Sequence, residues 1–165
     1  GKDRFAAKLD ENFSGSDYRL DNEPGQHYTY LYDYCGQPWK TQQLIRTYTQ
    51  DYYLNQPNGI NGNDDCGQMS AWYIFSVMGF YPVTPASGTY AIGAPQFPEL
   101  TLNYKVNGES RQFEIQAEDL SAKNQYIQSV TLDGRPLPSP FISHKDILSG
   151  HKLVFKMGPD PKPIW

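Results

Sequence analysis

Two neighbouring aspartates, Asp64 and Asp65, stand two residues before the apolar segment QMSAWYIFSVM. Asp65 and Gln68 have the spacing of a helix capping box, in which a carboxylate accepts a hydrogen bond from an early helical N–H. A cap needs only one acid, and two adjacent carboxylates repel each other. The pair therefore has two interpretations: a helix cap on a solvated loop, or a site that binds a metal ion or activates water.

A calcium-binding helix–loop–helix motif is one specific alternative for this segment. Asn61, Asn63 and Asp65 alternate as the ligands of such a loop do. However, Cys66 stands where that loop needs glycine, and Trp72 stands where it needs a bidentate glutamate. The sequence therefore excludes this motif.

A second polar cluster lies in residues 21–27, with the sequence DNEPGQH. Glu23 precedes a proline, which favours an extended backbone at Glu23. A carboxylate oxygen and an amide oxygen, such as those of Glu23 and Gln26, suit calcium or sugar hydroxyls. Glu23 and His27 are also candidates for proton transfer by residue type alone. The alternative is a polar loop that caps a helix beginning at His27.

The elements that must position these residues are helical in the first half of the chain. The segments with apolar residues at helical spacing are 2–12 (weakly), 27–36, 38–53 and 67–79. Gly36 and Gly79 are expected to end helices, and Pro38 is expected to begin one. The segment 67–79 is apolar nearly all round and should be buried. These helices do not form a closed bundle, so we expect them to belong to a larger helical array.

The second half, after Pro85, has the pattern of short strands separated by turns. The expected strand segments are TYAIGAP, LTLNYKV, RQFEIQAED, YIQSVTLDG, FISHKDI and KLVFKM. Asn-Gly at 107–108 and Asp-Gly at 133–134 are hairpin signals. Helices followed by antiparallel strands predict an α+β fold, with a helical part over residues 1–84 and a β-rich segment over 85–165.

The composition excludes some classes of function. The chain of 165 residues has 14 Lys and Arg against 18 Asp and Glu, so a nucleic-acid partner is not expected. No apolar stretch approaches the length of a membrane span. Aromatic residues make up 15% of the chain, and 13 of them are Tyr. They either form a surface that stacks on sugars or fill a core.

The cysteines and the remaining histidines give weaker signals. For Cys35 and Cys66, two buried free thiols are preferred over a disulfide. His144 and His151 lie far in sequence from the acidic clusters and are expected at the surface or in turns. The three histidines lack the spacing of a zinc site. Because the sequence opens at Gly1 in mid-pattern, we expect a piece of a larger protein.

Several segments carry a resemblance to a known family. They are NEPGQHYTYLYDYCGQPWKTQ, GINGNDDCGQMSAWYIFSVMGFYPV, YAIGAPQF, NQYIQSVTLDG and ISHKDILSG. Taken together and in this order, they resemble the C-terminal part of the glycoside hydrolase family 92 α-mannosidases, from about residue 20 to about residue 158. The run GNDDCGQMSAWYIFSVMGFYP is the longest and most specific.

The resemblance implies a fold and a chemistry. Enzymes of this family are calcium-dependent exo-α-mannosidases that invert the anomeric centre, with an N-terminal β-sandwich and an (α/α)6 barrel. The chain would then hold the last barrel helices and a C-terminal β segment. Its partners would be mannose-containing glycans and the N-terminal remainder of the enzyme. Family members are typically exported bacterial enzymes of glycan degradation, which implies a periplasmic or extracellular location.

The resemblance also implies catalytic roles. The acidic loop before the SAW helix supplies the base that activates water, and this position maps to Asp65. Asn63 matches a position where some relatives carry a second aspartate that also touches the water, and Asp64 is the fallback base. The family's general acid, a glutamate well upstream of the NEP segment, has no counterpart here, because Glu11 does not sit in a matching motif. The chain alone is therefore expected not to hydrolyse mannosides.

The family's calcium site maps onto Glu23 and Gln26, which match its E-P-x-Q pattern. The metal in these enzymes binds the mannose 2- and 3-hydroxyls, and Glu23 and His27 are the expected substrate-binding residues here. The alternative class of function is a non-catalytic carbohydrate-binding domain or a purely structural domain that completes a barrel. We expect the strand half to serve packing and support.

Overall fold

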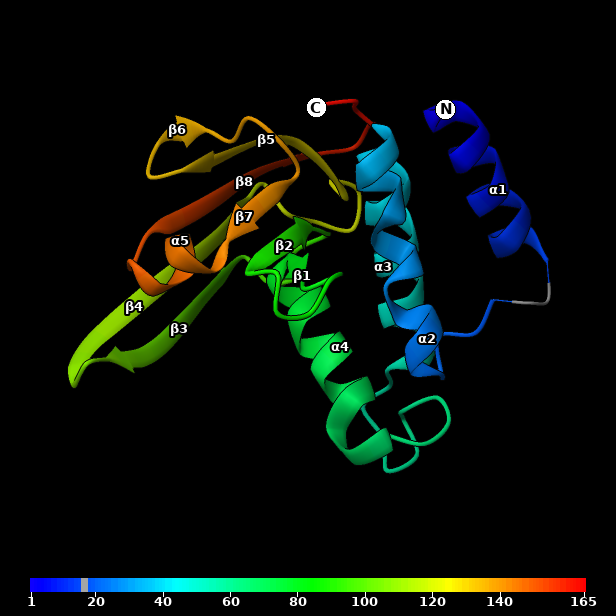
Figure 1. Cartoon of the computed structure of the whole chain (residues 1–165), viewed down its shortest axis with the longest axis horizontal. Helices are drawn as coiled ribbons and strands as arrows, with labels where there is room; N and C mark the ends of the chain where they lie inside the picture. Colours follow the sequence, from blue (N-terminus) through cyan, green and yellow to red (C-terminus); the bar gives the residue numbers. More distant parts are fainter. Residues whose placement is uncertain (16–17) are drawn as a thin grey trace.

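A computed structural model describes residues 1–15 and 18–165, with helices on one side and strands on the other (Figure 1). The helical elements are α1 (Lys2–Ser14), α2 (Glu23–Gln26), the 3₁₀ helix η1 (Tyr28–Cys35), α3 (Pro38–Tyr52), the 3₁₀ turn η2 (Asp65–Gly67), α4 (Gln68–Met78) and α5 (His144–Leu148). The strands are β1 (Phe80–Tyr81), β2 (Thr89–Ile92), β3 (Glu99–Val106), β4 (Glu109–Glu118), β5 (Tyr126–Leu132), β6 (Arg135–Pro136), β7 (Phe141–Ser143) and β8 (Lys152–Gly158). The mixture of helices and strands confirms the α+β class.

The helices of the first half begin and end close to the residues that the sequence predicted. Gly36 and Gly79 adopt left-handed backbones, with φ of 78° and 101°, and follow the ends of η1 and α4. Pro38 begins α3, whose bounds differ from the prediction by one residue. The weak signal at residues 2–12 corresponds to a full helix, α1, which continues to Ser14.

One local prediction in this half is refined and one is wrong. The helix predicted at 27–36 is present as a 3₁₀ helix over residues 28–35, in which Thr29, Tyr32 and Cys35 are buried at intervals of three residues. Glu23 is not extended before Pro24. It is the first residue of α2, and Asn22 is the extended residue, with φ of −139° and ψ of 129°.

The strands form two sheets. The smaller has the order β1-β2-β7, and the larger has the order β3-β4-β8-β5-β6. All pairings in them are antiparallel except β4 with β8, which is parallel and corrects the prediction of antiparallel strands throughout. The chain leaves the larger sheet after β6, passes through β7 and α5, and returns as β8 between β4 and β5, so β8 runs in the same direction as β4.

In the strand half, the two predicted hairpins are confirmed and one predicted strand is partly wrong. Both predicted hairpins are present, and Asn107, Gly108, Asp133 and Gly134 all have positive φ, as such tight turns require. The segment FISHKDI is only half a strand. Its second half is α5, because Ser143 and Asp146 form a complete capping box that begins a helix there.

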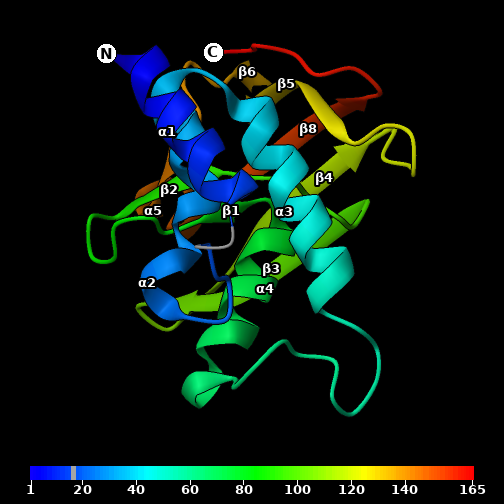
Figure 2. The same cartoon turned by 90° about the vertical axis from the view of Figure 1, so that its right-hand side faces the viewer.

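The core lies between α4, the small sheet and the inner face of the larger sheet. Phe113, Ile115 and Phe155 are buried on that inner face, in one cluster with Met78 and Phe80. Figure 2 shows α1 and α3 in front of the sheet layer. A second cluster contains aromatic residues of the helical half, such as Tyr30 and Trp72, so much of the aromatic content fills the core. Among the described residues, no helix combines the length and apolar character that crossing a membrane requires.

Candidate active site

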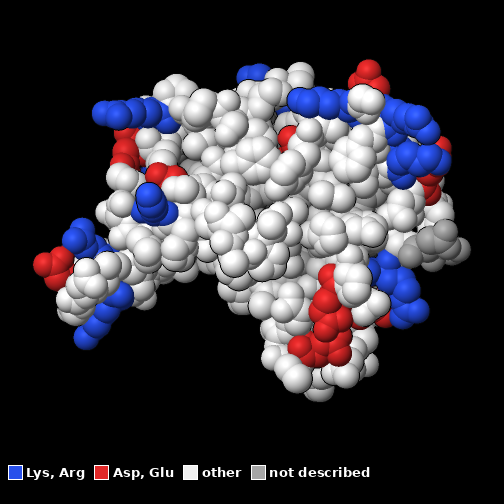
Figure 3. All heavy atoms as spheres, viewed as in Figure 1, with Lys and Arg blue, Asp and Glu red and all other residues white. Residues whose placement is uncertain are grey.

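The two polar segments singled out in the sequence lie against each other at the N-terminal end of α4. Gln68 Nε2 donates a hydrogen bond of 3.0 Å to Gln26 Oε1, across 42 positions of sequence. Trp72 Nε1 donates to the backbone oxygen of Gln26 at 3.0 Å. A Cβ atom placed on Gly62 would lie 3.1 Å from Cβ of Asp21. Acidic side chains gather over this end of the molecule (Figure 3).

Asp64, rather than Asp65, organises the start of α4. Its backbone oxygen accepts hydrogen bonds of 3.1 Å from the amides of Gly67 and Met69. Its carboxylate Oδ1 accepts a bond of 2.8 Å from the amide of Ser70. The predicted capping box of Asp65 and Gln68 is wrong, because the Gln68 amide donates to the backbone oxygen of Asp65 and the Asp65 amide donates to Asn63 Oδ1.

A run of left-handed residues separates Asp64 from α4. Asp65, Cys66 and Gly67 have φ of 49°, 59° and 99°. The left-handed conformation costs a non-glycine residue roughly 1–2 kcal/mol, and such strain is concentrated at functional sites. Aspartate and glycine tolerate this region best. The spacing of residues in the sequence did not predict three consecutive left-handed residues.

This turn leaves the Asp65 carboxylate available. The Asp65 backbone amide donates to Asn63 Oδ1 at 3.2 Å, so Asn63 braces the turn. The Asp65 carboxylate itself accepts no hydrogen bond from any residue that the structure describes, and the side chain is only half-buried. Of the two adjacent acids, one is used by the helix and the other is free for chemistry.

Gln26 is the most enclosed member of the site, with 1% of its surface exposed. Its Nε2 lies 3.0 Å from the sulfur of Met69, and its Oε1 accepts the bond from Gln68. Glu23 begins the same short helix but is exposed, and its carboxylate has no hydrogen-bond partner within the described residues. The two side chains offer a carboxylate and an amide oxygen from a single helical turn.

His27 follows this turn directly and is half-buried. Its ring meets the ring of Tyr28 edge-on, with centroids 4.8 Å apart. Burial lowers the pKa of His27, because the charged imidazolium loses solvation. His27 makes no side-chain cap at the start of η1, so the capping alternative for this segment is wrong.

Tyr53 was missed by the reasoning from sequence. Its hydroxyl donates to the backbone oxygen of Met69 at 3.0 Å, and its ring stacks between Trp72 and Tyr73, at centroid distances of 5.7 and 4.8 Å. Burial, aided by the negative charge of Asp64, raises the pKa of Tyr53, so the hydroxyl stays protonated. The Tyr53 hydroxyl thus fastens α3 to the first turn of α4, and only the folded chain brings Tyr53 to this partner.

The described residues contain no group of three or more His, Cys, Asp or Glu side chains that could hold a metal ion. Any cation at this corner would therefore take only part of its coordination from the chain. Cys35 and Cys66 are both free thiols, as preferred, but Cys66 is exposed, because it lies in the left-handed turn.

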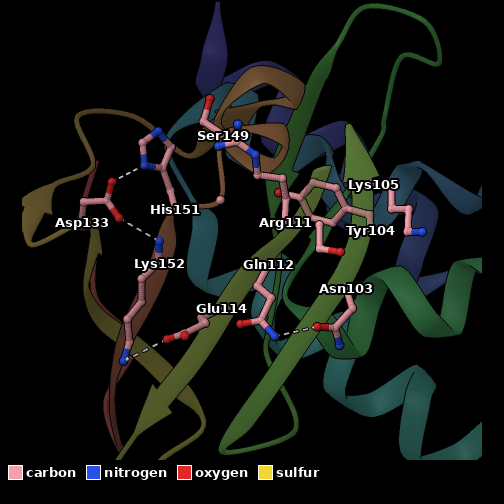
Figure 4. Close-up of a pocket in the computed structure, with 12 residues that line it drawn as sticks. Asn103, Tyr104, Lys105, Arg111, Gln112, Glu114, Asp133, Ser149, His151 and Lys152 are labelled. Carbon is pink, nitrogen blue, oxygen red and sulfur yellow. Dashed lines mark hydrogen bonds and ion pairs between the residues drawn. The ribbon is translucent and has the colours of Figure 1, made fainter. Parts of the chain in front are cut away.

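A hollow of about 700 Å³ lies elsewhere, on the outer face of the larger sheet (Figure 4). Here His151 pairs with Asp133, and Lys152 Nζ lies 3.5 Å from Glu114. Gln112 donates to Asn103 at 2.8 Å. These groups are exposed or half-buried and mostly satisfy one another, as on an ordinary solvated face.

The expected surface position of both remaining histidines is confirmed. His151 precedes β8 at the rim of that hollow. His144 is exposed as the first residue of α5, with Nδ1 3.0 Å from the Tyr90 hydroxyl. Neither approaches the acidic corner.

Comparison with known proteins agrees with the resemblance. The model of the glycosyl hydrolase family 92 catalytic domain matches residues 1–159. A family GH92 α-mannosidase of Bacteroides thetaiotaomicron is 40% identical, with a TM-score of 0.91 over 99% of this chain and 22% of that one. A family GH92 inverting mannosidase of Bacteroides thetaiotaomicron VPI-5482 is 38% identical, with a TM-score of 0.81 over 96% of this chain and 20% of that one.

An uncharacterized secreted glycosidase of the fungus Arthroderma benhamiae is 30% identical over 158 residues, which is 96% of this chain and 20% of that protein. The chain thus spans about one fifth of the length of these relatives. The match to the family model extends over both the helical and the strand half. The chain accordingly belongs to glycoside hydrolase family 92.

Proposed function

We propose that this chain is the C-terminal portion of an inverting, calcium-dependent exo-α-mannosidase acting on α-mannosides of glycans. The observation that carries the proposal is the free carboxylate of Asp65, held by a strained turn beside the segment of Glu23 and Gln26. Family membership, and the α-mannosidases among the similar structures, support the substrate class.

Inverting hydrolysis needs two carboxyl groups on opposite faces of the sugar. In our proposal Asp65 is the general base, which takes a proton from the attacking water. Asp64 is less suited, because its carboxylate already accepts the amide of Ser70. Asn63 supports the turn through the Asp65 amide instead of acting as a second base.

Calcium binding is compatible with the residues present. Calcium takes six to eight oxygen ligands, and Glu23 and Gln26 would supply a carboxylate and an amide oxygen. An amide oxygen has two lone pairs, so the hydrogen bond from Gln68 leaves one for the ion. When bound, calcium would hold the mannose 2- and 3-hydroxyls, with Glu23 and His27 close to the sugar. The remaining ligands would come from water, the sugar and the rest of the enzyme.

The rest of the enzyme is also the proposed source of the general acid and of the other helices of an (α/α)6 barrel. Residues 1–84 would complete that barrel, and residues 85–165 would form the supporting β-rich segment. We place the enzyme outside the cytoplasm, in the periplasm or beyond, of a bacterium that degrades glycans. The secreted fungal relative supports export.

The test uses the full-length enzyme and an aryl α-mannoside, with calcium and with a chelator. We expect the chelator to abolish turnover. We expect Asp65→Asn to lower kcat by about 10²- to 10⁴-fold while substrate still binds, because the general base is lost. Normal turnover by Asp65→Asn would leave Asp65 a structural residue and transfer the role of base to Asp64 or to an upstream carboxylate.

The 165-residue chain by itself is expected to release no mannose, because it lacks the general acid. The measurement is the same hydrolysis assay on the purified chain, with the full-length enzyme as positive control. Turnover by the chain alone would contradict the assignment of the acid to the rest of the enzyme.

A further inference from the structure

Gln68 is the first residue of α4 and the only described side chain that donates to the amide oxygen of Gln26. The bond of 3.0 Å joins the acidic turn to α2. Since Gln26 is buried, its amide group cannot exchange this partner for bulk water.

The orientation of the Gln26 amide follows from its two partners. A thioether sulfur can accept a hydrogen bond but cannot donate one, so the Gln26 NH₂ group must face Met69 Sδ, 3.0 Å away. The Gln26 oxygen then faces Gln68, which presents its own NH₂ group. A donor at position 68 and an acceptor at position 69 together exclude the flipped amide.

The fold does not need this bond to begin α4 or to pack it. The backbone oxygen of Asp65 accepts the backbone amide of Gln68, and Asp64 accepts the amides of Met69 and Ser70. Trp72, which is fully buried, fastens α4 to the backbone oxygen of Gln26. The Gln68 amide is therefore left with one task, which is to orient the Gln26 side chain.

We propose that Gln68 is a positioning residue, which holds the Gln26 amide oxygen in the orientation that binds calcium and so couples the acidic turn to the metal site. This inference rests on the proposed function, because it needs calcium at Glu23 and Gln26. Partners that orient metal ligands typically change metal affinity or activity by about 10- to 100-fold when they are replaced.

The test measures calcium binding by calorimetry in the full-length enzyme after removal of metal with a chelator. Gln68→Met keeps the length of the side chain and removes the donor. We expect calcium affinity about 10- to 100-fold weaker than in the wild type, from loss of the orienting bond. Gln50→Met makes the same change on the exposed face of α3 and should bind calcium like the wild type.

Kinetics separate positioning from a general loss of structure. Gln68→Met should raise KM for the aryl α-mannoside more than it lowers kcat, and extra calcium should restore the rate. Added to Gln26→Met, it should have little further effect on KM, because the group it orients is gone. Calcium affinity within twofold of the wild type, or a fully additive double variant, would overturn the inference.

If Gln68→Met does not fold, Gln68→Glu replaces it, since it keeps length and polarity but presents an acceptor to the Gln26 oxygen. The same expectations and the same contrary results apply. A wild-type enzyme that binds no calcium and does not hydrolyse the mannoside refutes the proposed function itself. An active, calcium-binding wild type with an unaffected Gln68 variant refutes only the positioning role.

Discussion

The N-terminal end of α4 and the outer face of the larger sheet both gather acidic and amide side chains, but these groups are held differently. On the sheet, Glu114 faces Lys152 and Asp133 faces His151, and each pair is largely in contact with water. At the end of α4, the Gln26 amide is buried, and the backbone of Asp65 is left-handed. The hollow of about 700 Å³ belongs to the sheet.

The difference teaches that the size of a hollow is a poor guide to chemistry. Exposed ion pairs contribute about 0–1 kcal/mol each and leave no group in need of a ligand. A strained backbone and an enclosed amide, by contrast, persist only where the surrounding structure enforces them. The acidic corner is therefore the better candidate, although it offers fewer charged groups.

The largest effect is expected from two glycine substitutions, one in the acidic turn and one in a turn of the larger sheet, at positions where a Cβ atom would meet no neighbour. Gly67 and Gly134 have φ of 99° and 75°, and a Cβ atom on either would meet nothing within 4 Å. Gly67→Ala and Gly134→Ala should each lower the free energy of unfolding by about 1–2 kcal/mol, through backbone strain alone. Only Gly67→Ala should lower kcat of the full-length enzyme, by up to about 100-fold, because it displaces Asp65.

Urea unfolding and mannoside hydrolysis of both variants check this prediction. Gly134→Ala is the matched control, because it lies in the β5–β6 turn of the sheet half. Equal loss of activity in the two variants would show that catalysis depends on overall stability rather than on the geometry of the acidic turn.

A buried carboxyl of the helical half gives an effect of intermediate size. Asp33 is 6% exposed, and neither carboxylate oxygen has a hydrogen-bond partner within the described residues. Burial raises the pKa of Asp33 well above its usual value, and the nearby Thr41 hydroxyl opposes that shift only in part. The Asp33 carboxyl therefore binds a proton more tightly in the folded chain than in the unfolded chain.

The stability that protonated Asp33 contributes is present below its unfolded pKa and is lost as pH rises through the folded pKa. Across that window the wild type should lose up to about 1.4 kcal/mol per pH unit from this group. Asp33→Asn should remove this loss, so its advantage in unfolding free energy should grow from pH 4 to pH 8. A constant difference across this range would show that Asp33 ionises normally. Glu114→Gln is the exposed control.

The smallest effect is expected in the hollow of the sheet. Lys152→Met removes the 3.5 Å ion pair with Glu114, and side chains of both residues are about half exposed. The free energy of unfolding should change by less than about 1 kcal/mol, and kcat and KM of the full-length enzyme should stay unchanged. A tenfold change in KM would make this hollow a substrate site and reverse the comparison.

Local signals in the sequence predicted much of the fold. Gly36, Gly79 and Pro38 marked helix ends, and the two hairpin dipeptides marked turns, because each depends only on neighbouring residues. The parallel pairing of β4 with β8 was not predicted, since it is set by where the chain returns after α5. The capping box that begins α5 was present in the sequence but was read as a strand.

Residue types and the resemblance together pointed to the candidate site but did not reveal its detail. The sequence brought attention to Glu23, Gln26 and the adjacent aspartates. It assigned the helix cap to Asp65, although the left-handed turn gives that task to Asp64. The bond between Gln26 and Gln68 joins positions 42 residues apart, and no spacing rule within one segment can reveal it.

The small sheet has a consequence for how the chain responds to cleavage. β1 precedes the exposed loop at residues 84–88 and β2 follows it, and the two strands pair directly. Beyond the loop, Gln42 of α3 accepts a hydrogen bond from the amide of Ile127 in β5. A protease that cut this loop would therefore release nothing: the two peptides would remain a folded, noncovalent complex, separable in denaturant but not by gel filtration.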